Sequence, residues 1–232
     1  TESTRQYGID IFMSLNAVLG GFKICQAGLG AKVHKASAPK LGIMFDQVIE
    51  TLLAILVQNK NNWMIRNNGD IFTPDTFGLD ILAEPQELDI DILDLKEKGR
   101  VSFNKYQADI KELLEPYAFS RINEMFEMEV FDLTILLWTR VFYNLLYRYD
   151  VSKNGEEKKK IINSLKPLYF ARSISFNYHT WKYNVKYSEM EIRRSALGFA
   201  SQKYYLWGLY SKGNKLKSNK TKKTKSKARS KS

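Results

Sequence analysis

The stretch that decides the fold class is Tyr7-Gly8-Ile9-Asp10-Ile11-Phe12-Met13-Ser14-Leu15-Asn16-Ala17-Val18-Leu19-Gly20-Gly21. Its apolar residues recur at a spacing of three to four, which predicts a helix over residues 9–19. The glycine pair that follows is typical of a helix C-cap, because glycine readily adopts the left-handed conformation that ends many helices. The apolar residues at helical spacing are Ile11, Leu15, Val18 and Leu19.

A short apolar segment, Phe22 to Leu29, follows this helix and predicts a buried strand. Cys25 lies in its middle, where a small buried residue is the usual occupant. A strand needs a partner for its backbone hydrogen bonds, and the sequence offers no clear second strand. Either this chain contains strands that the apolar pattern does not reveal, or the partner strands precede it. We favour the second alternative, because the chain begins at Thr1 without an initiator Met.

The rest of the chain up to the tail is predicted to be mainly α, so the fold class is mainly α after the end of an α/β domain. We expect Pro167 to start or kink a separate segment that runs through Phe170. Residues 67–97 are predicted to be an acidic connector, because residues 67–95 carry eight acids and no Lys or Arg. The predicted helices are 41–56, 103–115, 117–128, 130–149, 156–166 and 186–209.

The net charge of +11 is concentrated in a C-terminal tail, residues 212–232, which holds nine Lys, one Arg and no acid. Without these ten cations the chain carries 26 basic and 25 acidic residues. The tail is predicted to be disordered. The whole chain has 44% apolar and 13% aromatic residues. Residues 1–211 are therefore able to bury a core.

The single cysteine excludes an internal disulfide framework and suits a reducing, cytoplasmic location. The longest strongly apolar run, Leu133 to Thr139, is much shorter than the ~20 residues that cross a bilayer. No transmembrane segment and no signal peptide are expected.

Residues 7–45 contain the candidate site. They place an acid, Asp10, at a helix start and a histidine, His34, on the loop after the strand, which are positions where α/β proteins bind ligands. The flanking Lys32 and Lys35 favour a neutral imidazole, the form that binds metals. Spacing alone fits a surface or core histidine more often than a ligand.

This region resembles the end of the catalytic domain in the GT-A-type glycosyltransferases that make glucosyl-3-phosphoglycerate, glucosylglycerate and mannosylglycerate. The resemblance lies in Tyr7-Gly8-Ile9-Asp10, the strand, Leu29-Gly30-Ala31-Lys32-Val33-His34, and Leu41-Gly42-Ile43-Met44, in that order. Residues 165–172, Leu165-Lys166-Pro167-Leu168-Tyr169-Phe170-Ala171-Arg172, with Ser175-Phe176, are similar to a segment near the C-terminus of the glucosylglycerate-type enzymes. The final helix, Glu189 to Trp207, is similar more loosely.

The resemblance implies a role for each matching residue. His34 would bind a divalent cation, Mg²⁺ or Mn²⁺, on the donor diphosphate. Asp10 would be the catalytic carboxylate that hydrogen-bonds the sugar or acceptor and positions it. Tyr7, Gly8, Lys32 and Met44 would contribute to substrate binding, although Met44 fits core packing equally well. The implied partners are a nucleotide-sugar donor, a small hydroxy-acid acceptor and, left open, a second copy of the chain.

One part of the family pattern is absent. These enzymes need an upstream nucleotide-binding half that ends in Asp-x-Asp, and nothing before Tyr7 provides it. Asp89-Ile90-Asp91 is a literal Asp-x-Asp, but it follows His34 in the chain, so we interpret it as a solvated acidic run. A lone histidine does not hold a catalytic cation, and we expect this chain to be inactive without its N-terminal half.

A different class of function is a non-enzymatic helical module whose basic tail binds polyanions. Nucleic acid is not expected as a partner, because the tail has no aromatic residues for base stacking. A membrane role is disfavoured because the tail has no apolar face. His179 is expected to pack in its aromatic surroundings, and the aromatic side chains of residues 130–149 are expected to belong to the core rather than to a sugar-binding face.

Overall fold

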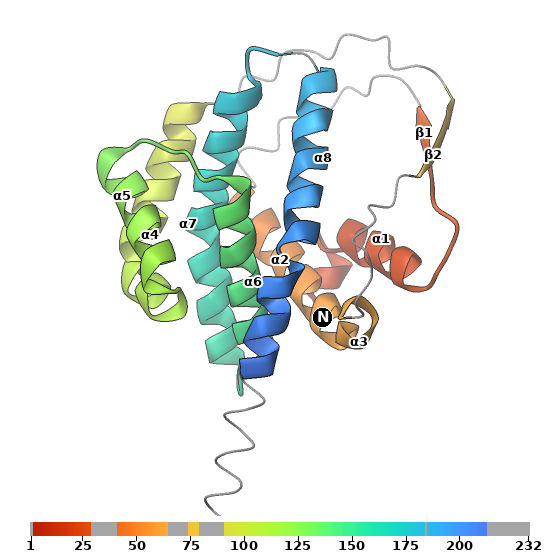
Figure 1. Cartoon of the computed structure of the whole chain (residues 1–232), viewed down its shortest axis with the longest axis horizontal. Helices are drawn as coiled ribbons and strands as arrows, with labels where there is room; N and C mark the ends of the chain where they lie inside the picture. The colour runs from red at the N-terminus through yellow and green to blue at the C-terminus, as the bar shows by residue number, and fades with distance from the viewer. Residues whose placement is uncertain (1, 29–40, 65–73, 79–90, 184, 213–232) are drawn as a thin grey trace, which may run out of the picture.

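The computed structural model describes residues 2–28, 41–64, 74–78, 91–183 and 185–212. Within these ranges the protein is a bundle of helices with one small sheet at its side (Figure 1), which confirms the mainly α class. The bundle consists of α2 (Leu41–Gln58), α3 (Lys60–Trp63), α4 (Ile92–Leu113), α5 (Pro116–Met128), α6 (Ile135–Val151), α7 (Gly155–Thr180) and α8 (Val185–Ser201), with further helical residues at 203–212.

Helix α7 is the centre of the bundle and contacts α2, α4, α6 and α8. The prediction that Pro167 starts a new segment was wrong, because α7 continues through this residue from Gly155 to Thr180. A proline inside a helix removes one backbone hydrogen bond and costs about 3 kcal/mol. Pro167 is buried, as are its neighbours Leu165 and Leu168. Tertiary packing therefore offsets this local cost.

Helix α4 begins at Ile92, eleven residues before the predicted start at 103, so the end of the expected acidic connector is helical. Asp91 caps this helix: its carboxylate accepts a hydrogen bond from the Asp94 backbone N–H at 2.9 Å. The first part of α4, before residue 103, has few buried apolar side chains: Leu95 is followed only by Phe103. The sequence therefore shows little helical periodicity there. Asp91 therefore has a structural role, while Asp89 lies outside the described residues.

The main core lies between α4 and α7, with α5 and α6 closing it. Gly99 lets α4 approach α7 closely, because a Cβ at this position would lie 3.3 Å from Phe170 Cβ. One turn further on, the Phe103 ring stacks on Phe126 at 4.1 Å, and Phe126 meets the edge of Phe131 at 5.2 Å. These rings connect α4, α5 and the segment that follows α5 around the apolar interior.

Helix α1 (Ile9–Leu19) follows a single 3-10 turn, η1 (Ser3–Arg5), and lies on the side of the bundle away from α4 and α5 (Figure 1). Its end confirms the predicted C-cap. Gly21 has φ +70°, the Gly21 N–H donates to Val18 O at 3.2 Å, and the Phe22 N–H donates to Ala17 O at 3.1 Å. This is the Schellman arrangement, in which glycine takes the left-handed position.

The short sheet corrects two expectations. Strand β1 (Cys25–Gly28) pairs in parallel with β2 (Asp75–Gly78), in the register Cys25↔Asp75 to Gly28↔Gly78, so a partner strand exists within this chain. Strand β2 was missed because Asp-Thr-Phe-Gly has no apolar alternation and lies in the acidic stretch. The strand was also expected to be buried, but Cys25, Gln26 and Ala27 are exposed.

The aromatic residues of 130–149 confirm the core prediction. Phe131, Phe142 and Tyr149 are buried, and Trp138, Tyr143 and Tyr147 pack against the core. Tyr143 also joins α6 to α8, because its hydroxyl donates a hydrogen bond to Phe199 O at 2.7 Å. Its ring meets the edge of the Phe199 ring at 5.5 Å.

Substitution of Tyr143 by Phe tests this connection. We expect a loss of about 0.5–1.5 kcal/mol of unfolding free energy at neutral pH.

Burial raises the pKa of Tyr143 to about 12, whereas an unfolded tyrosine titrates near pH ~10. Between these values the unfolded chain binds fewer protons, so stability present below pH ~10 is lost as the pH rises toward about 12. Urea titrations at several pH values should show a shallower alkaline decline in Tyr143→Phe, whereas the exposed Tyr117→Phe should behave as the parent chain does.

Candidate functional site

The start of helix α1, which carries the predicted site residues Tyr7, Gly8 and Asp10, is held against α2. The Tyr7 backbone N–H donates a hydrogen bond to Gln47 Oε1 at 3.1 Å. The Gln47 side-chain amide also donates to Gln6 Oε1. These contacts fix the position at which the chain enters α1, and they come from a residue 40 positions further along the chain.

A second contact lies in the turn before α1. The Ser3 hydroxyl donates a hydrogen bond to Glu50 Oε2, one turn beyond Gln47 on α2. Gly8 itself is buried, and its φ of −75° is one that any residue can adopt. A Cβ on Gly8 would lie 2.2 Å from Thr51 Oγ1 and 2.7 Å from Ser3 O. Glycine is required here for close approach to α2 rather than for an unusual backbone conformation.

The sequence analysis missed the three α2 residues that hold this helix start. Gln47, Glu50 and Thr51 follow one another at helical spacing on an amphipathic helix, where polar residues are ordinarily assigned to the solvent face. Thr51 is nevertheless buried. No short-range sequence signal connects them to residues 3–8, so the structure was needed to find them.

The predicted site residues are only partly brought together. Asp10 is exposed on the first turn of α1, Tyr7 is exposed just before it, and Met44 is half-buried on the first turn of α2, the helix that holds them. Lys32 and His34 lie outside the described residues. Among the residues that the structure describes, no group of three His, Cys, Asp or Glu side chains is arranged to bind a metal ion.

The second segment that carries the resemblance, residues 165–176, contacts the first one. Lys166 on α7 forms an ion pair with Asp46 on α2, with Nζ and Oδ2 2.7 Å apart. Both side chains are partly shielded from solvent, with 21% and 44% of their area exposed. The Tyr169 ring packs on Phe45 at 4.9 Å between ring centres. Segments about 120 positions apart therefore meet on one helix, α2.

Further along α7, this segment connects the surrounding elements. The Arg172 guanidinium donates hydrogen bonds to Leu133 O at 3.1 Å and to Ser195 Oγ at 3.2 Å. Burial lowers the pKa of Arg172. The Ser175 hydroxyl accepts a hydrogen bond from the Leu133 N–H at 2.8 Å and donates to Ala171 O at 2.9 Å. Arg172 and Ser175 thus attach the chain between α5 and α6 to the centre of the bundle, which is a structural role.

No protein-family model, curated protein or solved structure matches this chain. No helix in the described ranges is both long and apolar enough to cross a bilayer.

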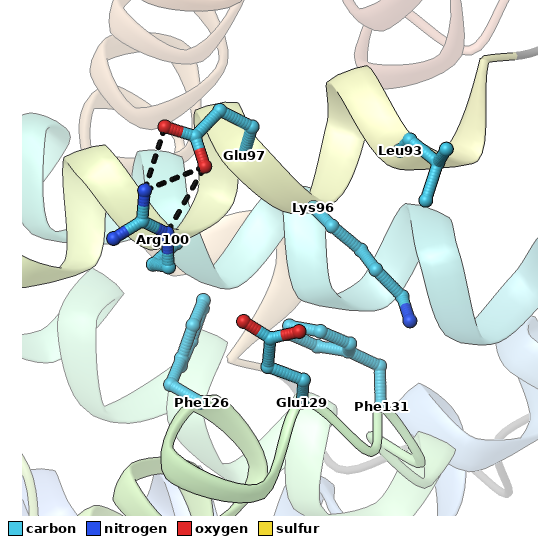
Figure 2. Close-up of a pocket in the computed structure, with 7 residues that line it drawn as sticks. All are labelled: Leu93, Lys96, Glu97, Arg100, Phe126, Glu129 and Phe131. Carbon is cyan, nitrogen blue, oxygen red and sulfur yellow. Dashed lines mark hydrogen bonds and ion pairs between the residues drawn. The ribbon is translucent and has the colours of Figure 1, made fainter.

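A shallow pocket lies apart from the α1 site, between the first turns of α4 and the end of α5 (Figure 2). Its volume is about 190 Å³, below the ~300–1,000 Å³ of typical ligand pockets. Arg100 is already paired with Glu97 at 2.7 Å, so the pocket offers little uncompensated charge. Its lining residues are Leu93, Lys96, Glu97, Arg100, Phe126, Glu129 and Phe131.

Two other expectations concern isolated residues. Cys25 is exposed rather than buried, because both faces of the two-stranded sheet are open around it. His179 was expected to pack among aromatic residues, but its side chain is half exposed, and its Nε2 lies 3.7 Å from Asp132 Oδ1. Neither residue belongs to a described metal-binding group.

Proposed function

We propose that this chain is the C-terminal part of a metal-dependent, retaining glycosyltransferase of the GT-A type, which transfers a sugar from a nucleotide-sugar to a small acceptor such as glycerate or phosphoglycerate. One observation supports this most directly. The two sequence segments that resemble these enzymes, 7–45 and 165–176, meet on α2, where Phe45, the last residue of the first segment, packs against Tyr169. The residue that follows it, Asp46, is paired with Lys166.

The surface around α1 also supports the proposal. No residue of α1 is buried, although Phe12, Met13 and Val18 are apolar, and Phe77 of β2 is exposed as well. Parallel strands usually occur in sheets that are covered on both faces. An N-terminal nucleotide-binding half with a parallel sheet would extend β1 and β2 and cover these side chains. We therefore propose such a half as the partner that completes the catalytic domain.

Within that domain, the residues of this chain have separate roles. The Asp10 carboxylate, exposed at the start of α1, would accept hydrogen bonds from sugar or acceptor hydroxyls and orient the acceptor toward the donor. Tyr7 and Met44 would border the same substrate, and Lys32 would meet the diphosphate. His34 would be a ligand of a divalent cation, which neutralises charge on the leaving nucleotide. With its single free cysteine, the protein suits the cytoplasm.

The test combines this chain with an N-terminal nucleotide-binding half and measures sugar transfer from nucleotide-glucose and nucleotide-mannose to glycerate and phosphoglycerate. We expect transfer only when both parts and Mg²⁺ or Mn²⁺ are present. A folded, assembled protein that transfers no sugar from any donor would disprove the function. Full activity in His34→Ala would disprove the metal assignment and leave the function standing.

A further inference from the structure

The outer face of α8 carries exposed apolar side chains in a regular pattern. Met190 and Leu197 are seven residues apart, so they lie on the same side of the helix, and they are 46% and 51% exposed. The opposite side packs on α6 and α7, with Gly198 against Ile135 and Phe199 against Tyr143 (Figure 1). In the described residues, nothing covers the outer side.

Cations surround these apolar side chains. Lys186, Arg193 and Arg194 lie within about 60° of the Met190–Leu197 direction around the helix, and all three are exposed. Two acids lie nearby: Glu191 has 15% of its side chain exposed and pairs with Arg194, and Glu189 is exposed about 90° from this direction. Lys186 and Arg193 remain as cations against Glu189, so the outer face is apolar with a small excess of positive charge.

Exposed aromatic side chains precede and follow α8 in the chain. Trp181 and Tyr183 precede α8 and are 70% and 58% exposed, and Tyr204 in the following helical residues is 75% exposed. Tryptophan and tyrosine are favoured at the boundary between lipid and water, because each has an apolar body and a polar atom. Long cationic side chains also suit this boundary, since their stems lie along apolar surface while the charge stays in water.

We propose that this face, defined as Lys186, Met190, Arg193 and Leu197, binds the surface of an anionic lipid bilayer together with the exposed Trp181 and Tyr183 that precede α8, and that the Lys-rich tail strengthens the attachment. The tail follows the helical residues 203–212 directly and adds nine cations after Lys212. It has no apolar face of its own, and α8 supplies that missing element. Stable attachment to a membrane surface commonly combines an apolar insertion with a polybasic segment.

Charge favours this occupant over a second copy of the chain. A symmetric dimer through α8 would bring the Lys186 and Arg193 side chains of two copies onto one interface, where like charges repel. An anionic surface is complementary to the same charges.

The experiment is a flotation assay of the full chain with phosphatidylcholine vesicles, prepared with and without phosphatidylglycerol, at about 0.1 M salt. We expect binding only to the vesicles that contain phosphatidylglycerol. The neutral double substitution Met190→Gln/Leu197→Gln should weaken binding by about tenfold or more, because it removes apolar burial without changing charge. Removal of residues 213–232 should weaken it by about 100-fold or more, since each nearby cation contributes about 1 kcal/mol.

The matched control is Val101→Gln/Met128→Gln, which alters two exposed apolar residues on α4 and α5 and should bind as the parent chain does. If the α8 double variant loses helicity, the single variants Met190→Gln and Leu197→Gln are each expected to lose about threefold. Absence of binding to anionic vesicles would overturn the proposal. So would binding that depends on the tail but not on Met190 and Leu197, a soluble dimer dissociated by the double variant, or an equal dependence on these residues in binding an oligonucleotide.

Discussion

Substitution of Phe103 by Ala is expected to lower the free energy of unfolding by about 3–5 kcal/mol, a large fraction of the total for a domain of this size. Phe103 is 2% exposed on the side of α4 that faces the core. Its ring stacks on Phe126 at 4.1 Å with 7° between the ring planes. Truncation removes the buried ring, leaves a cavity, and deprives Phe126 of its stacking partner. Urea denaturation followed by circular dichroism measures the change.

The matched control for Phe103→Ala is Val101→Ala, two residues earlier on the same helix and exposed to solvent. It should change stability by less than about 0.5 kcal/mol, because it removes no buried contact. A loss below about 1 kcal/mol in Phe103→Ala would show that the interface between α4, α5 and α7 is not the main source of stability.

Features with strong local signals could be predicted from the sequence. The helix at 9–19 and its glycine cap were correct because the apolar spacing and Gly21 determine structure within a few residues. The aromatic residues of α6 were correctly assigned to the core, because such large apolar side chains are rarely left in water.

Features that depend on distant partners could not be predicted. Strand β2 has almost no strand signal and forms because β1, about 50 positions earlier, offers its backbone. Helix α7 passes through Pro167 because the surrounding helices bury it, which overrides the local preference. Gln47 and Thr51 support the start of α1 from α2, and nothing near them in the sequence indicates it.

The candidate site depends on the resemblance for its residues and on the structure for the contacts that hold them. Asp10, Tyr7 and Met44 were found by resemblance, and the structure adds that two of the elements that carry them, α1 and α2, are in contact. The α2 residues that hold the start of α1, Gln47, Glu50 and Thr51, were found only in the structure. If Asp10 positions an acceptor, its effect depends on how firmly α2 holds the first turn of α1.

Substitution of Gly8 by Ala tests that dependence. The new Cβ would lie 2.2 Å from Thr51 Oγ1 and 2.7 Å from the backbone oxygen of Ser3, so the start of α1 must move away from α2. The backbone at Gly8 suits alanine, and the effect is therefore steric. A displacement of about 1 Å at a positioning residue can cost about 100-fold in rate, and we expect a loss of this size in kcat/KM for the proposed sugar transfer, measured on the chain assembled with the proposed N-terminal half.

Two comparisons separate placement from general damage. Gly42→Ala makes the same chemical change on the first turn of α2, where a Cβ would meet nothing within 4 Å, and it should leave transfer unchanged. Asp10→Asn alters an exposed side chain and should abolish transfer without lowering stability, whereas Gly8→Ala should lower both. Full activity in Gly8→Ala, together with loss in Asp10→Asn, would show that the contact with Thr51 does not position Asp10. The acceptor would then depend on the carboxylate but not on how α2 holds the helix that carries it.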